Sequence, residues 1–146
     1  MNPVNAIDVS ASGLVAQRIR LNTIANNLAN ISTTEDAAGR ASPYVRQRVV
    51  FRPGMPDGSS SAGVHVAAVE NDDPRNPLNF GAEPFRLKYE PGHPNANEQG
   101  YVLYPNVDVT REYVNALEAA RAYEANILAV ETYKAMANQI TRLYEP

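Results

Sequence analysis

Apolar residues recur every seven positions near the start of the chain. The positions are Ile7, Leu14, Leu21 and Leu28, with Ile24 and Ile31 beside them. Side chains at this spacing fall along one side of a helix. The pattern therefore predicts a helix from Pro3 to about Ile31, roughly 40 Å long at 1.5 Å per residue. Asn2 would cap this helix, and proline suits its first position.

The same seven-residue repeat continues for longer near the end of the chain. Its members are Val109, Ala116, Tyr123, Val130, Ala137 and Tyr144. The repeat predicts a second helix from Asp108, its N-cap, to about Leu143, roughly 54 Å long. A seven-residue repeat kept over this length favours supercoiled pairing, so we expect the two helices to form an antiparallel coiled coil.

These two sets of residues are together called the assembly seam. The positions that accompany them are partly polar: Ser10 and Gln17 in the first helix, Glu112 and Asn126 in the second. A helical hairpin on so narrow an apolar strip buries too little surface to offset the ordering of about 60 residues. We therefore expect these helices to need further neighbours.

The middle of the chain has the pattern of short strands and turns. Nine of the 11 prolines and seven of the eight glycines fall within residues 32–107. The predicted strands, which are rich in β-branched or alternating residues, are 44–51, 64–69, 85–90 and 100–107. Between them we expect a hinge and two irregular loops, at 32–42, 52–61 and 71–84.

The expected fold class is thus α+β. Residues 1–31 and 108–146 would form one discontinuous helical domain, and residues 32–107 would form the hinge and a small β-rich middle module. The tip of the loop at 52–61 is rich in glycine and serine and is expected to be exposed.

Composition narrows the function classes. Lys and Arg number 13 against 16 Asp and Glu, giving a formal net charge of −3, so nucleic-acid binding is not expected. The lack of cysteine excludes disulfides, Fe–S clusters, thiolate zinc sites and cysteine nucleophiles. No apolar run approaches the ~20 residues of a membrane helix, and the start of the chain lacks the apolar stretch of a cleavable signal peptide. We expect neither membrane insertion nor such a signal.

The motifs of common enzyme classes are missing: there is no glycine-rich nucleotide loop, zinc-protease motif or nucleophile elbow. His65 in a predicted strand and His93 in a turn occupy unlike settings, which favours surface roles over a metal or Ser–His site. We expect no catalytic residue, metal or cofactor. The competing hypothesis is a small hydrolase or lyase that uses His93 with Asp72, Asp73 or Tyr101, and His93→Ala would abolish its turnover.

Four asparagines stand out in the first predicted helix, because asparagine is a mediocre helix former. Asn22, Asn26 and Asn30 are spaced four apart, and Asn27 lies next to them. We call these four residues the asparagine stripe. The stripe is either a solvated polar face or a row of amides that hydrogen-bond to neighbouring helices in an assembly, and the pattern alone leaves both open.

Several segments contain recognisable motifs. Ser12-Gly13-Leu14 precedes Ala25-Asn26-Asn27-Leu28-Ala29-Asn30, and the middle of the chain contains PYVRQRVVF (43–51), YEPGHPNAN (89–97) and GYVLYPNVD (100–108). With the segment 120–126, these resemble the axial proteins of the bacterial flagellum, the rod and hook family, and within it the proximal rod subunits. The motif positions of the middle module are Tyr89, Pro91, His93, Pro94, Asn97, Gly100, Tyr101, Pro105 and Asn106. Residues 57–61 and 71–79 fit no motif.

The resemblance implies a structural subunit without catalysis. Such proteins are exported through the flagellar type III apparatus without a cleaved signal and polymerise helically in the periplasm into the drive-shaft that transmits motor torque. Their terminal helices form an inner coiled-coil layer. The implied partners are further copies of the chain, the rod proteins FlgB, FlgF and distal FlgG, the adaptor between rod base and MS ring, and the export apparatus. The resemblance also favours the intersubunit interpretation of the asparagine stripe.

Two further hypotheses compete with this one. A paralogous axial protein would share the terminal helices, but the segments HPNAN and GYVLYPNVD argue against it. A periplasmic adaptor or chaperone would hold clients between its helical ends. It would be monodisperse with both helices formed, whereas a rod subunit alone is expected to have poorly ordered ends.

Overall fold

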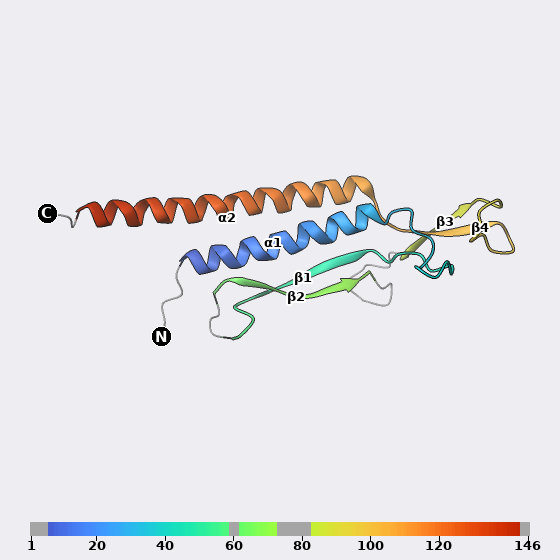
Figure 1. The fold of residues 1–146 in the computed structure, drawn as a ribbon, viewed down its shortest axis with the longest axis horizontal. Helices are drawn as coiled ribbons and strands as arrows, with labels where there is room; N and C mark the ends of the chain where they lie inside the picture. The colour runs from blue at the N-terminus through green and yellow to red at the C-terminus, as the bar shows by residue number, and fades with distance from the viewer. Residues whose placement is uncertain (1–5, 59–61, 73–82, 144–146) are drawn as a thin grey trace. The chain divides into compact units, whose positions relative to one another are not determined.

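A computed structural model describes residues 6–58, 62–72 and 83–143 of the chain (Figure 1). The elements in order are α1 (Ala6–Ala29), β1 (Gln47–Pro53), β2 (Val64–Asn71), β3 (Phe85–Tyr89), β4 (Tyr101–Pro105) and α2 (Val109–Leu143). Two helices with two small sheets make an α+β fold, which confirms the predicted class. Among the described residues, no helix combines the length and apolarity needed to cross a membrane.

Both predicted helices are present. The start predicted at Pro3 lies outside the described residues, and α1 ends at Ala29, two residues before the predicted end. Its last turn is closed by Asn30, whose side-chain amide donates to the Asn26 carbonyl at 2.9 Å. The Asp108 carboxylate accepts from the backbone N–H of Thr110 at 2.9 Å and of Arg111 at 3.2 Å, so the predicted N-cap of α2 is confirmed.

The strands pair as two separate sheets. β1 pairs with β2, and β3 pairs antiparallel with β4, with Leu87 opposite Leu103 and Tyr89 opposite Tyr101. Each predicted strand is present with shifted ends. β1 begins at Gln47 rather than at residue 44, since the Tyr44 N–H instead donates to the carbonyl of Thr33 at 3.1 Å.

The predicted hinge at 32–42 is an ordered turn. Glu35 and Ala41 form an isolated antiparallel bridge. Within it, the Asp36 carboxylate accepts from the backbone of Ala38 and Arg40 at 2.9 and 3.0 Å. The Arg40 guanidinium also binds this carboxylate and holds the pKa of Asp36 below its usual value.

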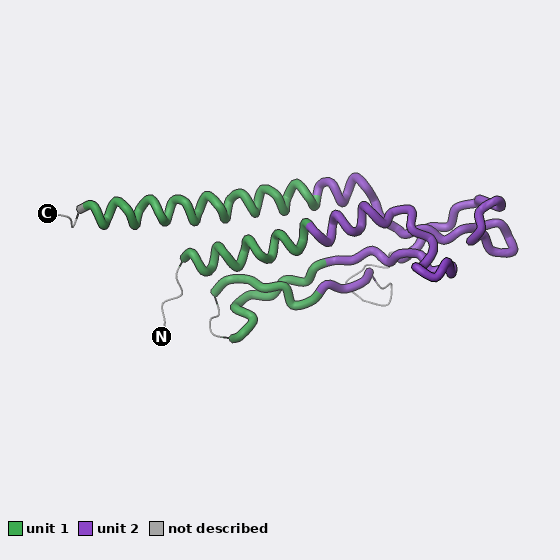
Figure 2. Tube along the Cα trace, viewed as in Figure 1, with its two compact units in different colours: residues 1–21, 49–68, 115–146 green, residues 22–48, 69–114 purple. Residues whose placement is uncertain are grey.

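The chain forms two compact units (Figure 2). Unit 1 comprises Met1–Leu21, Val49–Ala68 and Asn115–Pro146, and unit 2 comprises Asn22–Arg48 and Val69–Val114. Each unit therefore combines helical and strand segments. The predicted division into a terminal helical domain and a middle module stays a prediction.

In unit 1, a glycine lets the two helices approach closely. The backbone of Gly13 on α1 faces Asn126 on α2, and a Cβ at this glycine would lie 2.8 Å from the Asn126 amide oxygen. Gly13 lies against Asn126, whereas Arg20, further along α1, lies within hydrogen-bond distance of the earlier α2 residues Asn115 and Glu118. The two helices thus run antiparallel within this unit.

Ser12 ties the sheet of unit 1 to α1. Its hydroxyl donates to the Val9 carbonyl at 2.6 Å and accepts from the backbone N–H of Val64 at 3.1 Å. The first residue of β2 is thereby fixed to the helix by a side chain of the Ser12-Gly13-Leu14 motif.

The buried side chains of unit 2 come mainly from α1, from β4 and from the start of α2. They include Ile24, Val102, Val107 and, less expectedly, the carboxylate of Glu112. The hairpin turn needs Gly100, which has a φ of 82° and lies against the Tyr89 ring, where a Cβ would approach to 2.9 Å.

Candidate assembly surfaces

The assembly seam is only partly covered within one chain. Ile24 is buried, whereas Val109 and Ala137 are exposed, and Tyr144 lies outside the described residues. The half-buried members are Ile7, Leu14, Leu21, Leu28, Ile31, Ala116, Tyr123 and Val130. A single chain therefore leaves most of the seam in contact with solvent.

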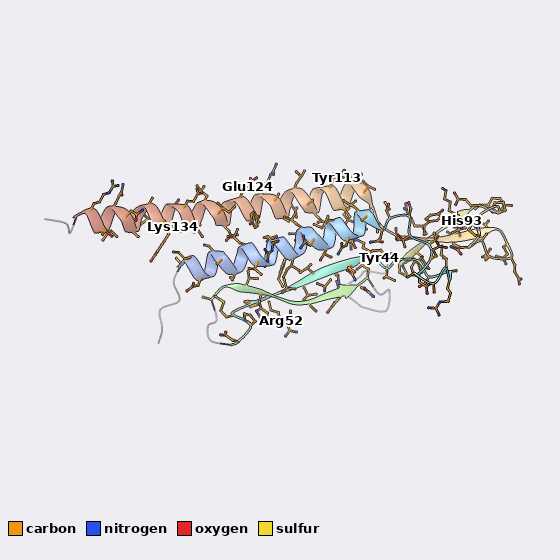
Figure 3. All side chains as sticks on the ribbon, viewed as in Figure 1. Tyr44, Arg52, His93, Tyr113, Glu124 and Lys134 are labelled. Carbon is orange, nitrogen blue, oxygen red and sulfur yellow. The ribbon has the colours of Figure 1, made fainter. Side chains whose placement is uncertain are left out.

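α2 exposes many large apolar side chains. Leu128 is 63% exposed and Tyr113, labelled in Figure 3, is 61% exposed. The others are Val109, Val114, Leu117, Ile127, Tyr133, Met136 and Ile140. All side chains of residues 131–142 are exposed. This surface is therefore a candidate contact surface, because proteins rarely leave so many large apolar side chains exposed without a partner.

An open apolar groove lies between α1 and α2 in unit 1. Its volume is about 490 Å³. The lining residues are Ala6, Ser10, Ala125, Leu128, Ala129, Thr132, Tyr133 and Met136. Half of these residues are small, and the groove is open to solvent.

The asparagine stripe is not uniform. Asn22 and Asn26 are exposed, and Asn30 is half-buried at the end of α1, where its amide oxygen accepts from the Thr33 hydroxyl at 3.1 Å. Asn27 is 1% exposed. The four residues of the stripe therefore have three different environments, two of which offer amide groups to solvent or to a neighbour.

Asn27 is bound inside its own unit. Its amide nitrogen donates to the Gln47 carbonyl at 2.8 Å and to the Glu112 carboxylate at 3.2 Å. Its amide oxygen accepts from the Gln47 N–H at 2.8 Å and from the Tyr44 hydroxyl at 2.9 Å. We therefore assign Asn27 a role within the chain, separate from the rest of the stripe.

Glu112 is the second centre of this buried network. Its carboxylate, 0% exposed as a residue, accepts from two nitrogens of the Arg46 guanidinium, with the Nε–Oε1 distance 2.9 Å. Arg46 also donates to Asp72 at 2.6 Å. Burial opposes the charge on Arg46, but the bonds to the two carboxylates outweigh it and raise the pKa of the guanidinium.

The network also affects Tyr44. Burial and the nearby carboxylate of Glu112 raise the pKa of its hydroxyl above the usual value. The hydroxyl therefore keeps its proton and donates a hydrogen bond to Asn27 at all physiological pH values.

The family-motif residues of the middle module build the β3–β4 turn. The Asn97 amide oxygen accepts from the backbone of Gln99 and Tyr101 at 3.0 and 2.9 Å, and the His93 ring accepts from the Asn95 N–H at 3.1 Å. Of the nine motif residues, Gly100 and Pro105 are buried, and His93 and Asn106 are half-buried. The exposed members are Tyr89, Pro91, Pro94, Asn97 and Tyr101.

One face of the hairpin is apolar and exposed. Leu87 and Leu103 are cross-strand partners, as are Tyr89 and Tyr101, and all four side chains are at least 40% exposed. The two tyrosine rings pack edge to face with centroids 5.3 Å apart. This face is a second candidate contact surface, at the opposite side of the hairpin from buried Val102.

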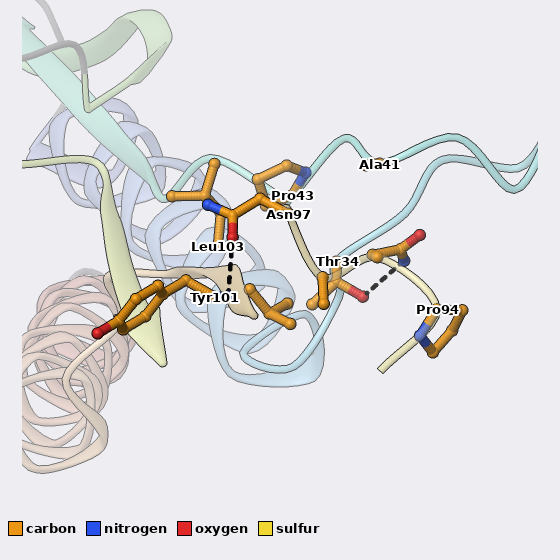
Figure 4. A pocket seen from close by; sticks show the side chains of 10 residues that line it. Thr34, Ala41, Pro43, Pro94, Asn97, Tyr101 and Leu103 are labelled. Carbon is orange, nitrogen blue, oxygen red and sulfur yellow. Dashed lines mark hydrogen bonds between the residues drawn. The ribbon is translucent and has the colours of Figure 1, made fainter. Parts of the chain in front are cut away.

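A small open pocket of about 320 Å³ lies beside the hairpin in unit 2 (Figure 4). The Asn95 amide donates to the Thr34 hydroxyl at 3.3 Å, and the Tyr101 N–H donates to Asn97. The lining is completed by alanine, proline and aliphatic residues, namely Ala41, Pro43, Pro94, Ala96, Val102 and Leu103. Its polar groups already bind one another, so the pocket offers little to orient a reactant.

The residues of the enzyme hypothesis have structural partners. Asp72 is held by Arg46, His93 lies in the turn against the Tyr104 ring, and Asp73 lies outside the described residues. In the part of the chain that the structure describes, no three His, Asp or Glu side chains gather as metal ligands. Among the described residues, His93 thus belongs to the turn and Asp72 to the network around Arg46.

Sequence reasoning missed the pairing of Arg46 with Glu112. The sequence pattern placed Glu112 only among the polar positions that accompany the assembly seam. The available signal was a charged residue at a seam-companion position together with an arginine in a predicted strand. The partner could not be identified, because 66 residues separate the two.

Comparison with known proteins identifies the family. Residues 7–35 match the family described as "Flagella basal body rod protein", and residues 98–143 match "Flagellar basal body rod FlgEFG protein C-terminal". The flagellar basal-body rod protein FlgC of Borreliella burgdorferi is 36% identical over 93% of both chains. FlgC of Salmonella typhimurium is 41% identical over 91% of both, and FlgC of Yersinia enterocolitica is 40% identical over 93% of both.

These similarities span the segments that form α1, the hairpin and α2, and they agree with the predicted resemblance. The chain belongs to the FlgC family, and it is a structural subunit of the bacterial flagellar basal-body rod.

Proposed function

We propose that this subunit polymerises helically into the proximal rod and transmits motor torque there without catalysing a reaction. The exposed apolar side chains of α2 support this most directly. In one chain the last third of the helix, residues 131–142, has only exposed side chains. Each large apolar side chain that a neighbour covers contributes about 1.5–3 kcal/mol, so assembly supplies what the single chain lacks.

The terminal segments 1–31 and 108–146 would form the inner layer of the polymer as a coiled coil, and residues 32–107 would form the outer module. The antiparallel contact of Gly13 with Asn126 and of Arg20 with Glu118 supports side-by-side pairing. The exposed and half-buried seam residues would then pack against helices of other subunits.

The exposed amides of Asn22 and Asn26 would hydrogen-bond to those neighbouring helices. Both residues lie on α1 with their side chains exposed. Asn30 would contribute less, because its amide already closes the helix end. Among the motif residues of the middle module, the exposed Tyr89 and Tyr101 are the best placed to contact another subunit.

The proposed partners are further copies of this chain, the rod proteins FlgB, FlgF and FlgG, and the adaptor at the rod base. The subunit would reach the periplasm unfolded through the flagellar type III export apparatus, without a cleaved signal. The sequence supports this route because a chain without cysteine cannot be locked by disulfides before or during export.

The test is a charge placed on the exposed apolar surface of α2. Leu128→Asp should cost the isolated chain little stability, because the side chain is 63% exposed, but it should abolish rod assembly. A carboxylate buried in a subunit contact lacks a partner and costs several kcal/mol. Motility, immunoblots of exported protein and thermal melts of the purified chain measure these effects.

The matched control is Asn138→Asp, which adds the same charge at an exposed polar position of the same helix. It should swim at or near the wild-type rate. Wild-type swimming by Leu128→Asp would contradict the proposal, and so would loss of export by that variant.

A further inference from the structure

The amide of Asn27 has no hydrogen-bonding capacity left for another molecule. A carboxamide offers two N–H donors and an oxygen with two acceptor positions. In this structure the N–H donors bind the Gln47 carbonyl and the Glu112 carboxylate. The amide oxygen accepts hydrogen bonds from the Gln47 N–H and the Tyr44 hydroxyl. The residue is also 1% exposed. Asn27 therefore acts within its own chain.

The partners of Asn27 come from two distant parts of the sequence. Tyr44 and Gln47 lie 17 and 20 residues away, before and at the start of β1, whereas Glu112 lies 85 residues away in the first turn of α2. Arg46 closes the arrangement, since it binds the same Glu112 carboxylate with a side chain only 14% exposed. All these residues belong to unit 2.

We propose that Asn27, Arg46 and Glu112 form a latch within one chain, which sets the first turn of α2 against the last turns of α1 before the subunit meets another copy. Asn27 is then a positioning residue of the monomer. Exposed Asn26 beside it remains available for contacts between subunits. The inference goes beyond the proposed function, because the latch is a property of the single chain.

The chemistry explains why asparagine is required at this position. Aspartate would keep the two acceptor positions but would place a second carboxylate at the 3.2 Å contact with Glu112 and opposite the Gln47 carbonyl. Alanine would leave the Gln47 N–H and the Tyr44 hydroxyl without their partner, and a buried polar group left unpaired is costly. Each substitution breaks a different part of the latch.

The first experiment measures amide hydrogen exchange in the full-length chain at a concentration where it is monomeric. Asn27→Ala should speed exchange of the Gln47 N–H about tenfold or more. The Val64 N–H, which Ser12 binds in unit 1, should be unchanged and serves as the internal reference. Asn26→Ala, one residue along the same helix, is the matched control and should leave Gln47 protected.

Two milder variants keep the test decisive if Asn27→Ala does not fold. Tyr44→Phe removes one bond to the Asn27 oxygen and nothing else, so it should raise Gln47 exchange by less than Asn27→Ala. Asn27→Asp should be strongly destabilised, and Glu112→Gln should relieve part of that loss by removing the opposing charge. The double variant should therefore be more stable than the sum of the two single changes predicts.

Wild-type Gln47 protection in both Asn27→Ala and Tyr44→Phe would overturn the latch, as would equal effects of Asn26→Ala and Asn27→Ala. Strict additivity of Asn27→Asp and Glu112→Gln would also count against it. None of these measurements involves assembly. Failure of the latch would leave the polymerisation proposal standing, and failure of Leu128→Asp to block assembly would leave the latch standing.

Discussion

At the residue scale, Gly13 has two opposing effects on stability. Glycine within a helix costs about 1 kcal/mol relative to alanine. At this position the missing Cβ lets α2 come close enough for Asn126 to lie over the α1 backbone, with three amide atoms 2.8–3.0 Å from where a Cβ would be. The neighbouring Asn126 amide is itself held by the Ala122 carbonyl at 2.8 Å, so it cannot withdraw freely.

Gly13→Ala should therefore destabilise the isolated chain by up to about 2 kcal/mol. Overpacking costs about 1–3 kcal/mol, and the better helix propensity of alanine offsets about 1 kcal/mol of it. In an Asn126→Ala background the clash is gone, and the same substitution should be neutral or stabilising by up to about 1 kcal/mol. Urea denaturation of the four chains measures both effects. Equal costs of Gly13→Ala in the two backgrounds would contradict the close approach.

At the element scale, the helices were predictable and the details of the strands were not. The repeat of Leu14, Leu21 and Leu28 predicts the end of α1 to within two residues, because several apolar positions along the helix repeat the same pattern. Strand ends depend on single contacts that the sequence does not reveal, such as the Tyr44 N–H bonding to Thr33. The buried network around Glu112 was missed for the same reason, since its members meet only in the folded chain.

The β3–β4 hairpin has a pH dependence that follows from three linked side chains. Lys88 binds the Glu90 carboxylate at 2.6 Å and the Tyr104 hydroxyl donates to it at 2.7 Å, which together lower the pKa of Glu90 below its usual value. The bond to Glu90 raises the pKa of Tyr104 above its usual value. Glu90 stabilises the hairpin above its ordinary pKa and loses this effect as pH falls through its lowered pKa. Tyr104 stabilises it below its ordinary pKa and loses this effect as pH rises through its raised pKa.

Glu90→Gln should return the pKa of Tyr104 toward 10.0 and remove the acid-side loss of hairpin stability. NMR titration of the Tyr104 ring at low ionic strength measures the first effect, because salt screens exposed pairs. Glu98→Gln, an exposed acid in the same turn, is the control and should leave the Tyr104 titration unchanged. An unaltered Tyr104 pKa in Glu90→Gln would contradict the bond.

At the scale of the whole molecule, order is unevenly supported along α2. Its first turn is tied by buried Glu112, and Ala119 is fully buried. From residue 131 to residue 142 every side chain is exposed, so contacts with the rest of the chain support that part of the helix only weakly. A helix formed in this way is marginal in water unless a neighbour packs against it.

The isolated chain should accordingly show less helix by circular dichroism than the assembled one. Hydrogen exchange should locate the loss: amides near Ala119 should be protected, and those of residues 131–142 should exchange within seconds to minutes. Self-association at higher concentration should slow that exchange. Full protection of residues 131–142 at micromolar concentration would contradict the dependence of this segment on assembly.

Burial of Glu112 also fixes the rotational phase of α2. Each residue turns the helix by about 100°, so a side chain held at the first turn determines the direction of every later one. Ala119 then points within about 20° of Glu112, in agreement with its full burial, whereas Leu117 and Leu128 point about 140° and 160° away. A change at Glu112 that let the helix turn by one residue would redirect Leu117, Leu128 and the other exposed apolar side chains, although none of those residues had been altered.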